Sequence, residues 1–256
     1  PLGEVAEPKV GLQTGDNARF LRQWFEVSHS RTCFDADSRE TAATSGSKWF
    51  PYNKGGEYRK WWGNQEHVVN WSDDGTDIQN FRDATGKQRS RPQNMDSYFR
   101  AATSWSKVSS GSPAFRYYPP GFIYDVAGTS IFTNNRSHTL EILGFTNSHI
   151  CELMLKAVAP TLNFEVGQIA SLPVADNLNG NAATLADNLV NLSRNDWNAY
   201  ETSWDFQTSP LIQRSRPGDS LYDALEHWWQ DSLHAAREAQ ELETENNRYW
   251  AEVYGL

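Results

Sequence analysis

The sequence predicts an α+β protein with an irregular mixed sheet in residues 1–175, followed by a helical region in residues 176–256. Between Trp49 and Val126, short aromatic-rich segments are separated by turns of glycine, proline and serine, which is typical of strands. After residue 182, leucine and aromatic residues recur at helical spacing. The longest such pattern, in residues 219–254, has an acidic opposite face and predicts a long amphipathic helix.

Size and composition indicate a globular protein. The chain has 256 residues, of which 38% are hydrophobic and 21% charged, enough for one large domain or two small ones. Cys33 and Cys151 are the two cysteines, so no disulfide framework is implied and a reducing cytoplasm fits. No apolar run approaches the roughly 18 residues of a membrane helix. We therefore expect a cytoplasmic protein without a membrane partner.

The charge is unevenly distributed. The net charge is −9, yet residues 48–118 contain eleven Lys and Arg against seven Asp and Glu. Residues 219–256 contain nine acidic residues and two Arg. A polyanionic partner would therefore contact the middle of the chain and be repelled by its acidic end.

Residues 10–27 begin the ordered part. Asp16 or Asn17 could cap a short helix after the Gly11–Gly15 block, or the block could be strand, turn and strand. The block is not a phosphate-binding P-loop, because no Gly-Lys-Ser/Thr follows. Residues 28–47 are polar and predict a long exposed loop.

Residues 48–64, KWFPYNKGGEYRKWWGN, interleave basic and aromatic side chains. Such a pattern can neutralise phosphates and cover sugar or base surfaces, and the Gly-Gly pair lets backbone approach a ligand. The alternative is a β-hairpin that turns at residues 53–56 and has its aromatic rings in the core. The candidate DNA-binding residues of this stretch are Lys48, Lys54, Arg59 and Lys60.

Residues 68–108 contain the second group of candidates. Residues 68–81 predict a strand, an Asp-Asp-Gly turn and one or two helical turns. The two acids invite a metal site, but a solvated turn is favoured because Asp77 is the one further ligand at a useful spacing. In residues 86–100, Arg can pair with guanine, and Gln or Asn with adenine, unless the segment is only a polar surface loop. The candidates here are Lys87, Arg89, Arg91, Gln93, Asn94 and, on a predicted strand at 98–108, Lys107.

The later segments alternate between predicted strands and helices. Residues 115–118 and 122–126 predict strands around a Pro-Pro-Gly turn, and residues 139–156 a strand that runs into an amphipathic helix capped at Asn147-Ser148. Residues 164–174 predict a short strand that stops at Pro173, and residues 175–183 a linker. Helical spacing marks residues 182–193, 195–206 and 219–254.

No catalytic, cofactor-binding or metal-binding residue is predicted. A methyltransferase needs a glycine-rich turn between strand and helix for S-adenosylmethionine, and an Asn/Asp-Pro-Pro-aromatic motif for the target amine. At residues 118–121 a Tyr precedes the prolines and a Gly follows, so the polar acceptor is missing. His227 and His234 lack the Cys or carboxylate support of a metal site. A nucleophile elbow and a Glu-x-Lys nuclease motif in usable context are missing too.

Several long blocks in one order resemble the recognition half of PglX-type adenine DNA methyltransferases from BREX phage-defence systems, which are relatives of type IIG restriction-modification enzymes. The blocks include GLQTGDN at residues 11–17, the stretch at 48–64, VVNW at 68–71, SRPQN at 90–94, TSWSK at 103–107, GFIYD at 121–125, PTLNF at 160–164, LPV at 172–174 and ETSWD at 201–205.

The resemblance implies a sequence-specific DNA-recognition fragment of an N6-adenine DNA methyltransferase that lacks the catalytic domain. The parent enzyme would use S-adenosylmethionine and flip the target adenine out of the duplex. The implied partners are double-stranded DNA, the missing N-terminal methyltransferase domain and other BREX proteins. The fragment itself is expected to be inactive.

Two other functions stay open at this point. An aromatic-rich module could bind glycans or peptides, since tryptophan surfaces also suit sugars. A scaffold could dock other defence proteins through the acidic helix. A salt series separates DNA recognition from glycan binding, because DNA affinity falls steeply with salt and sugar stacking hardly responds.

Overall fold

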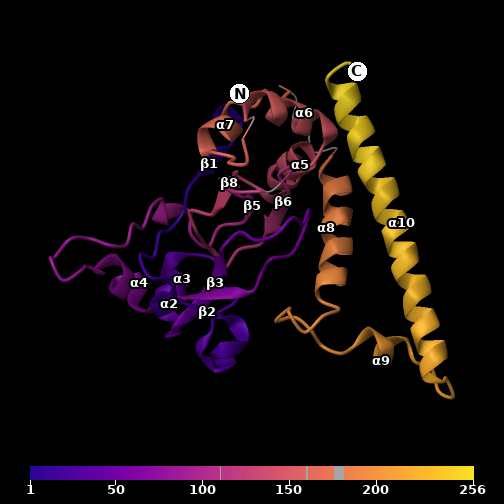
Figure 1. Cartoon of the computed structure of the whole chain (residues 1–256), viewed down its shortest axis with the longest axis horizontal. Coiled ribbons are helices and arrows are strands. Elements are labelled where there is room, and N and C mark those ends of the chain that lie inside the picture. The colour runs from indigo at the N-terminus through magenta and orange to yellow at the C-terminus, as the bar shows by residue number, and fades with distance from the viewer. Residues whose placement is uncertain (110, 160, 176–181) are drawn as a thin grey trace.

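The computed structural model describes residues 1–109, 111–159, 161–175 and 182–256, and the chain has the predicted α+β fold (Figure 1). The first sheet contains, in spatial order, β1 (Glu7–Lys9), β8 (Gly128–Phe132), β5 (Ala102–Ser106) and β6 (Phe115–Tyr118). The second contains β2 (Leu21–Gln23), β4 (His67–Asn70), β3 (Trp49–Asn53) and β7 (Ile123–Tyr124). The second sheet is mixed, because β3 and β7 run parallel whereas its other pairs are antiparallel.

Helices surround both sheets. Those near the second sheet are α2 (Asn17–Phe20), α3 (Arg39–Thr44) and α4 (Ser72–Gln79). Those near the first are α1 (Leu2–Val5), α5 (Arg136–Thr146), α6 (His149–Val158) and α7 (Val166–Ala170). The C-terminal region contains α8 (Ala183–Trp197), α9 (Pro210–Arg214) and α10 (Leu221–Val253), with α8 and α10 side by side (Figure 1).

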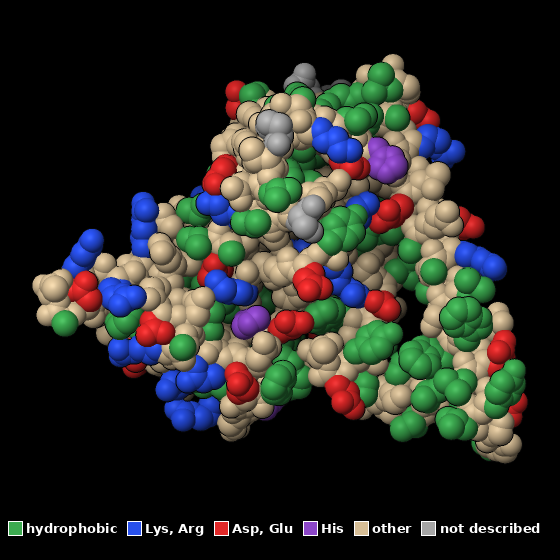
Figure 2. Space-filling model, viewed as in Figure 1, with side chains coloured by type: hydrophobic (Ala, Val, Ile, Leu, Met, Phe, Trp, Pro, Cys, Tyr) green, Lys and Arg blue, Asp and Glu red, His purple; other side chains and the backbone are tan. Residues whose placement is uncertain are grey.

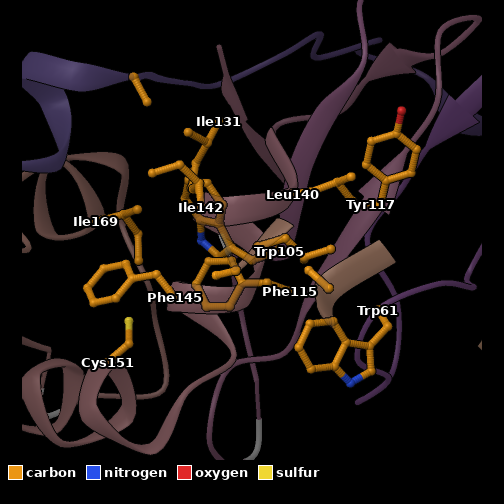
Figure 3. Packing of buried hydrophobic residues seen from close by; sticks show 14 of the residues in the cluster. Trp61, Trp105, Phe115, Tyr117, Ile131, Leu140, Ile142, Phe145, Cys151 and Ile169 are labelled. Carbon is orange, nitrogen blue, oxygen red and sulfur yellow. The ribbon is translucent and has the colours of Figure 1, made fainter. Parts of the chain in front are cut away.

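The larger core lies between the first sheet and the helices. Trp105 and Phe115 of the sheet pack with Phe145 of α5, and Figure 3 shows these rings converging. The same cluster includes Leu189 of α8 and Trp250 of α10. One core therefore contains residues from both of the regions that the sequence separates at about residue 175, and the division into two domains stays a prediction.

A smaller core supports the second sheet. It contains Phe50 and Tyr52 of β3, Val69 of β4 and Trp71, all fully or nearly fully buried. In α4, Asp73, Asp74 and Gly75 have positive φ, so the predicted Asp-Asp-Gly turn is present at the start of the helix. Asp16 accepts a hydrogen bond from the Arg19 amide and caps α2, as one of the two alternatives for residues 11–27 predicts.

The long acidic amphipathic helix is confirmed as α10. Ser220 begins it with a capping box that includes Asp223. In its C-terminal half, Trp250 is buried and Asn246 donates a hydrogen bond to the Gly144 carbonyl of α5. Its N-terminal half exposes several apolar side chains, namely Leu221, Tyr222, Leu225 and Trp229. Among the described helices, none combines the length and apolar character needed to cross a membrane.

Two predicted strands are helical instead. Residues 139–146 belong to α5, which buries eight consecutive residues from Thr139 to Thr146, so no alternation of exposed and buried positions marks its type. Ser148 caps α6, as predicted. Residues 166–170 form α7. A capping box between Glu165 and Gln168 begins this helix and favours it over the predicted strand.

Three further local predictions were wrong. Strand β3 pairs with β4 across a long connection, so residues 53–56 do not form a tight hairpin turn. Residues 28–47 contain α3 with its own Ser38 capping box, so they are not a continuous loop. Helix α8 ends at Trp197, although helical spacing continues in sequence to residue 206. Most of the predicted linker, residues 176–181, lies outside the described residues.

Candidate nucleic-acid interface

Two loops that are distant in sequence form one surface. The backbone amide of Gln13 donates to the Arg91 carbonyl at 3.0 Å, and the Arg91 amide donates to the Gln13 carbonyl at 2.7 Å. This reciprocal pair joins residues 11–17 to residues 86–94. The side chains of Gln13, Lys87, Arg89 and Arg91 remain exposed. The two loops therefore hold basic and amide side chains on a fixed backbone.

Glycines allow the first loop to pack this closely. A Cβ on Gly11 would lie 1.7 Å from the Tyr124 carbonyl oxygen, and one on Gly15 would lie 2.6 Å from that of Arg89. Gly15 also has a φ of +77°. The space beside both glycines is occupied by the chain's own backbone, so the two glycines allow this loop to pack closely.

Gln93 and Asn94 hold the two loops together. The Gln93 amide donates to the Gly11 carbonyl at 3.2 Å, and the Asn94 amide donates to the Val10 carbonyl at 2.9 Å. Asn94 has a φ of +51°, which suits asparagine. The structure thus gives both side chains a positioning contact, and their reading of bases stays a prediction.

Lys54 neutralises a buried carboxylate. Its ammonium group lies 2.9 Å from Asp125, whose side chain is 2% exposed. Tyr52 also donates to Asp125. Burial, reinforced by this carboxylate, raises the pKa of Tyr52 well above its usual value. Lys54 therefore joins the strands of the second sheet, and it remains only partly exposed at the Gly-Gly segment.

Arg59 and Lys60 contact the C-terminal helices. Arg59 forms an ion pair with Asp196 of α8, and Lys60 lies 3.2 Å from Glu243 of α10. The neighbouring Trp61 indole donates to the same Glu243 at 2.6 Å. The basic stretch is thus bonded to the acidic region, and both cations have an intramolecular partner.

The remaining sequence candidates differ in their surroundings. Lys107 lies 3.0 Å from Glu165. Lys48 lies over the Trp49 ring at 5.4 Å from its centroid. Lys87, Arg89 and Arg91 are exposed and form no ion pair with a described residue. Four of the ten candidates are thus paired, namely Lys54, Arg59, Lys60 and Lys107.

The aromatic rings of residues 48–64 mostly belong to the core. Phe50, Tyr52, Trp61 and Trp62 are buried, and Tyr58 is 61% exposed. The core alternative for these rings therefore holds, apart from Tyr58. The stretch offers one exposed ring, which is not the row of flat faces that would stack on a glycan.

Acidic clusters do not form a metal site in the part of the chain that the structure describes. Asp74, a candidate ligand, forms an ion pair with Arg39 and accepts a hydrogen bond from the Trp71 indole. Asp73 is exposed on its left-handed turn. The Asp-Asp-Gly segment is thus a structural turn.

Lys and Arg side chains gather over the part of the molecule that contains α2, α4 and β2 (Figure 2). Several polar and basic residues in and near these elements are not among the sequence candidates, including Arg82 within residues 48–118 itself. The missed polar and basic residues are Gln13, Arg19, Arg22, Arg31 and Arg82. The basic residues at 19, 22 and 31 could have been found by counting charge over residues 19–48, where Arg and Lys also recur.

Comparison with known proteins identifies the relatives. No protein-family model matches the chain. It is 36% identical to the adenine-specific methyltransferase PglX of Lacticaseibacillus casei (strain Zhang), over 100% of this chain and 21% of the relative. It is 33% identical to the adenine-specific methyltransferase BrxX of Escherichia coli O9:H4 (strain HS), over 96% of this chain and 19% of the relative.

The chain spans about a fifth of the length of these curated relatives. The matched region includes both sheets and the C-terminal helices, because it spans nearly the whole chain. The chain is therefore homologous, over its whole length, to one part of the PglX and BrxX adenine-specific methyltransferases of BREX systems.

Proposed function

We propose that the chain is the DNA-recognition part of an N6-adenine DNA methyltransferase that acts in phage defence. The observation that supports this most directly is the locked pair of loops at residues 11–17 and 86–94. It presents Gln13, Arg89 and Arg91 on a backbone fixed by reciprocal hydrogen bonds. Homology to adenine-specific methyltransferases supports DNA as the partner.

The chemistry of these side chains suits the major groove. A guanidinium can donate two hydrogen bonds to guanine, and a glutamine amide can bond adenine in the same paired manner. A fixed backbone lowers the entropy lost on binding, because the loops need no ordering. We assign base contacts to Arg91 and Gln13, and backbone phosphate contacts to Lys87 and Arg89.

The reaction itself belongs to the longer protein. We propose that S-adenosylmethionine and the target adenine are bound by a methyltransferase domain outside this chain, the chain's main partner besides DNA. Other BREX proteins are further candidates. Flipping the adenine requires a firm hold on the flanking duplex, which the recognition part would supply. Such an enzyme would act in the cytoplasm, where bacterial DNA lies. We retain residues 1–175 and 176–256 as the proposed division of the fragment.

The test begins by selecting, from a random duplex library, the sequences that the chain retains. Arg91→Ala should cost about 1–3 kcal/mol on a selected duplex and much less on a random one. Lys87→Ala should weaken both duplexes equally and lower the log–log salt slope by about one unit. Fluorescence anisotropy at several salt concentrations measures both quantities.

A matched control comes from the acidic region. Arg237 is exposed on α10, so Arg237→Ala removes one positive charge without touching the loops. Equal losses for Arg91→Ala and Arg237→Ala would show a general charge effect and contradict the assignment of base contacts. If no sequence is enriched and no duplex is bound, the proposed function is wrong. Calorimetry with S-adenosylmethionine should show no binding to this chain.

A further inference from the structure

Two cations lie against one aromatic ring beside the two loops at residues 11–17 and 86–94, the recognition loops. The Arg19 guanidinium is 4.9 Å from the centroid of the Phe81 ring, and that of Arg89 is 5.8 Å from the same centroid. Arg19 also lies 5.1 Å from the ring of Phe20. The ring therefore brings a residue of α2 next to a residue of the second loop.

A second ring holds another pair of cations. The Arg22 guanidinium lies 5.9 Å from the Trp49 ring, and the Lys48 ammonium group lies 5.4 Å from it. Arg22 is additionally oriented by hydrogen bonds to the Ala18 and Leu21 carbonyls at 2.7 and 2.6 Å. Arg22 of β2 follows Arg19 of α2 by three residues, so the two rings and their cations form one row along this part of the chain.

Arg31 extends this row at the end near Trp49. Its carbonyl accepts a hydrogen bond from the Lys48 amide at 3.0 Å, which places the two residues side by side. Its own side chain is exposed. The basic stripe is defined as Arg19, Arg22, Arg31 and Lys48, and it adjoins the recognition loops through Arg89.

No member of the basic stripe forms an ion pair with a described residue. Two nearby acids are engaged by backbone instead. Asp16 accepts the Arg19 amide, and Glu26 accepts the Gln23 amide. Elsewhere, Arg59 and Lys60 do find carboxylates. The chain thus leaves a set of like charges without a carboxylate partner among the described residues near the β2 edge of the second sheet.

Like charges placed together repel one another, and cation–π contacts offset this only in part. A bound polyanion would relieve the repulsion. We propose that the basic stripe binds the phosphate backbone of duplex DNA beyond the bases that the recognition loops contact. This inference rests on the proposed function, and it extends the contacted DNA from a short recognition site to its flank.

The test uses the whole chain and duplexes of two lengths. The stripe variant Arg19→Gln/Arg22→Gln/Arg31→Gln removes three positive charges. The control variant Arg216→Gln/Arg237→Gln/Arg248→Gln removes three from exposed positions in the C-terminal region, so the net charges match. One duplex has about one helical turn and carries a selected sequence, and the other extends it to about three turns. Affinity is measured by anisotropy over a salt series.

The stripe variant should bind the short duplex like the wild type. On the long duplex it should lose affinity, and its log–log salt slope should fall by about 0.9 for each phosphate contact removed. The control variant should match the wild type on both. Arg31→Gln alone should show the same pattern to a smaller degree, and its side chain forms no hydrogen bond or ion pair with another described residue. This variant therefore tests the proposal even if the triple variant unfolds.

Four results would overturn the proposal. Wild-type affinity of the stripe variants for the long duplex would show that the stripe meets another partner, such as an acidic protein surface. Equal losses in stripe and control variants would show a net-charge effect. If the wild-type chain binds the short duplex but gains nothing from the longer one, the stripe proposal fails while the proposed function stands. If it binds neither, both fail.

Discussion

Replacing Glu243 should remove contacts that join the basic stretch at residues 48–64 to the acidic helix α10. This carboxylate of α10 accepts the Trp61 indole N–H at 2.6 Å and lies 3.2 Å from the Lys60 ammonium group. Trp61 is 3% exposed, so its N–H cannot turn to water when the acceptor is removed. Glu243→Ala removes both contacts, whereas Glu243→Gln keeps an acceptor for the indole and removes only the charge.

The two substitutions should therefore differ in magnitude. Leaving a buried N–H without an acceptor costs about 1–3 kcal/mol. The ion pair is worth less, about 0.2–1 kcal/mol, because the Lys60 and Glu243 side chains are 19% and 35% exposed. Glu243→Ala should lower the free energy of unfolding by about 2–3 kcal/mol, and Glu243→Gln by at most about 1 kcal/mol.

Urea denaturation followed by tryptophan fluorescence measures these differences. Glu245→Ala is the control, because Glu245 is exposed on the same helix and forms no ion pair with a described residue. It should unfold at the wild-type midpoint. If Glu243→Ala and Glu243→Gln share one midpoint, the indole hydrogen bond does not contribute as argued. Wild-type stability of Glu243→Ala would refute the anchoring role altogether.

Two further predictions concern folding. Burial lowers the pKa of His67, so the unfolded chain binds the proton at a higher pH than the folded chain does. The free energy of unfolding that depends on neutral His67 is present above about pH 6.5 and should fall as the pH drops below that value. Urea midpoints between about pH 7.5 and 5.5 should fall less steeply for His67→Gln than for the wild type, while exposed His234→Gln should keep the wild-type slope. Gly11→Ala should cost about 3 kcal/mol or more, since its Cβ would lie 1.7 Å from the Tyr124 oxygen. A Cβ on Gly167 in α7 would meet open space, so Gly167→Ala should stabilise the protein by about 0.5–1 kcal/mol. Wild-type stability of Gly11→Ala would contradict the packing described for Gly11.

The sequence predicted the elements whose signals are local. Ser220 with Asp223 marks the start of α10, and the spacing of its apolar residues marks its length. Asp16 and Ser148 were likewise found as possible helix caps. Such signals act between residues three or four positions apart, so they can be recognised without knowledge of the tertiary structure.

The misassigned elements lack such a signal. Residues 139–146 of α5 are all buried, and the helix packs against the first sheet and α8, so exposed and buried positions do not alternate along the run. A run that is buried on every side has no exposed face to set a period, and neither a strand nor a helix is favoured by spacing alone. Strand β3 also pairs in parallel with β7, which is distant in sequence, and local spacing gives no sign of the wide connection between β3 and β4.

The candidate site was predictable in residue type but not in pairing. Sequence shows that Lys60 and Arg91 are basic, and only the fold shows that Lys60 meets Glu243 while Arg91 meets no described acid. Gln93 and Gln13 are the same residue type in similar loops. The first donates to a carbonyl of the other loop, whereas the second is exposed beside Arg91. Contacts between segments about 80 residues apart therefore decide which side chains hold the loops together and which remain exposed.

Segregation of charge would allow a chain with a net charge of −9 to approach DNA, as the proposed function requires. Helix α10 lies on the opposite side of the molecule from α2 and α4 (Figure 1). Exposed charges separated by more than about 10 Å are largely screened at 0.1 M salt. The acids of α8 and α10 that contact the basic stretch at residues 48–64, Asp196 and Glu243, are themselves paired with Arg59 and Lys60. A polyanion at the recognition loops would thus meet unpaired cations at short range, while the acidic helix would repel it only weakly and from a distance.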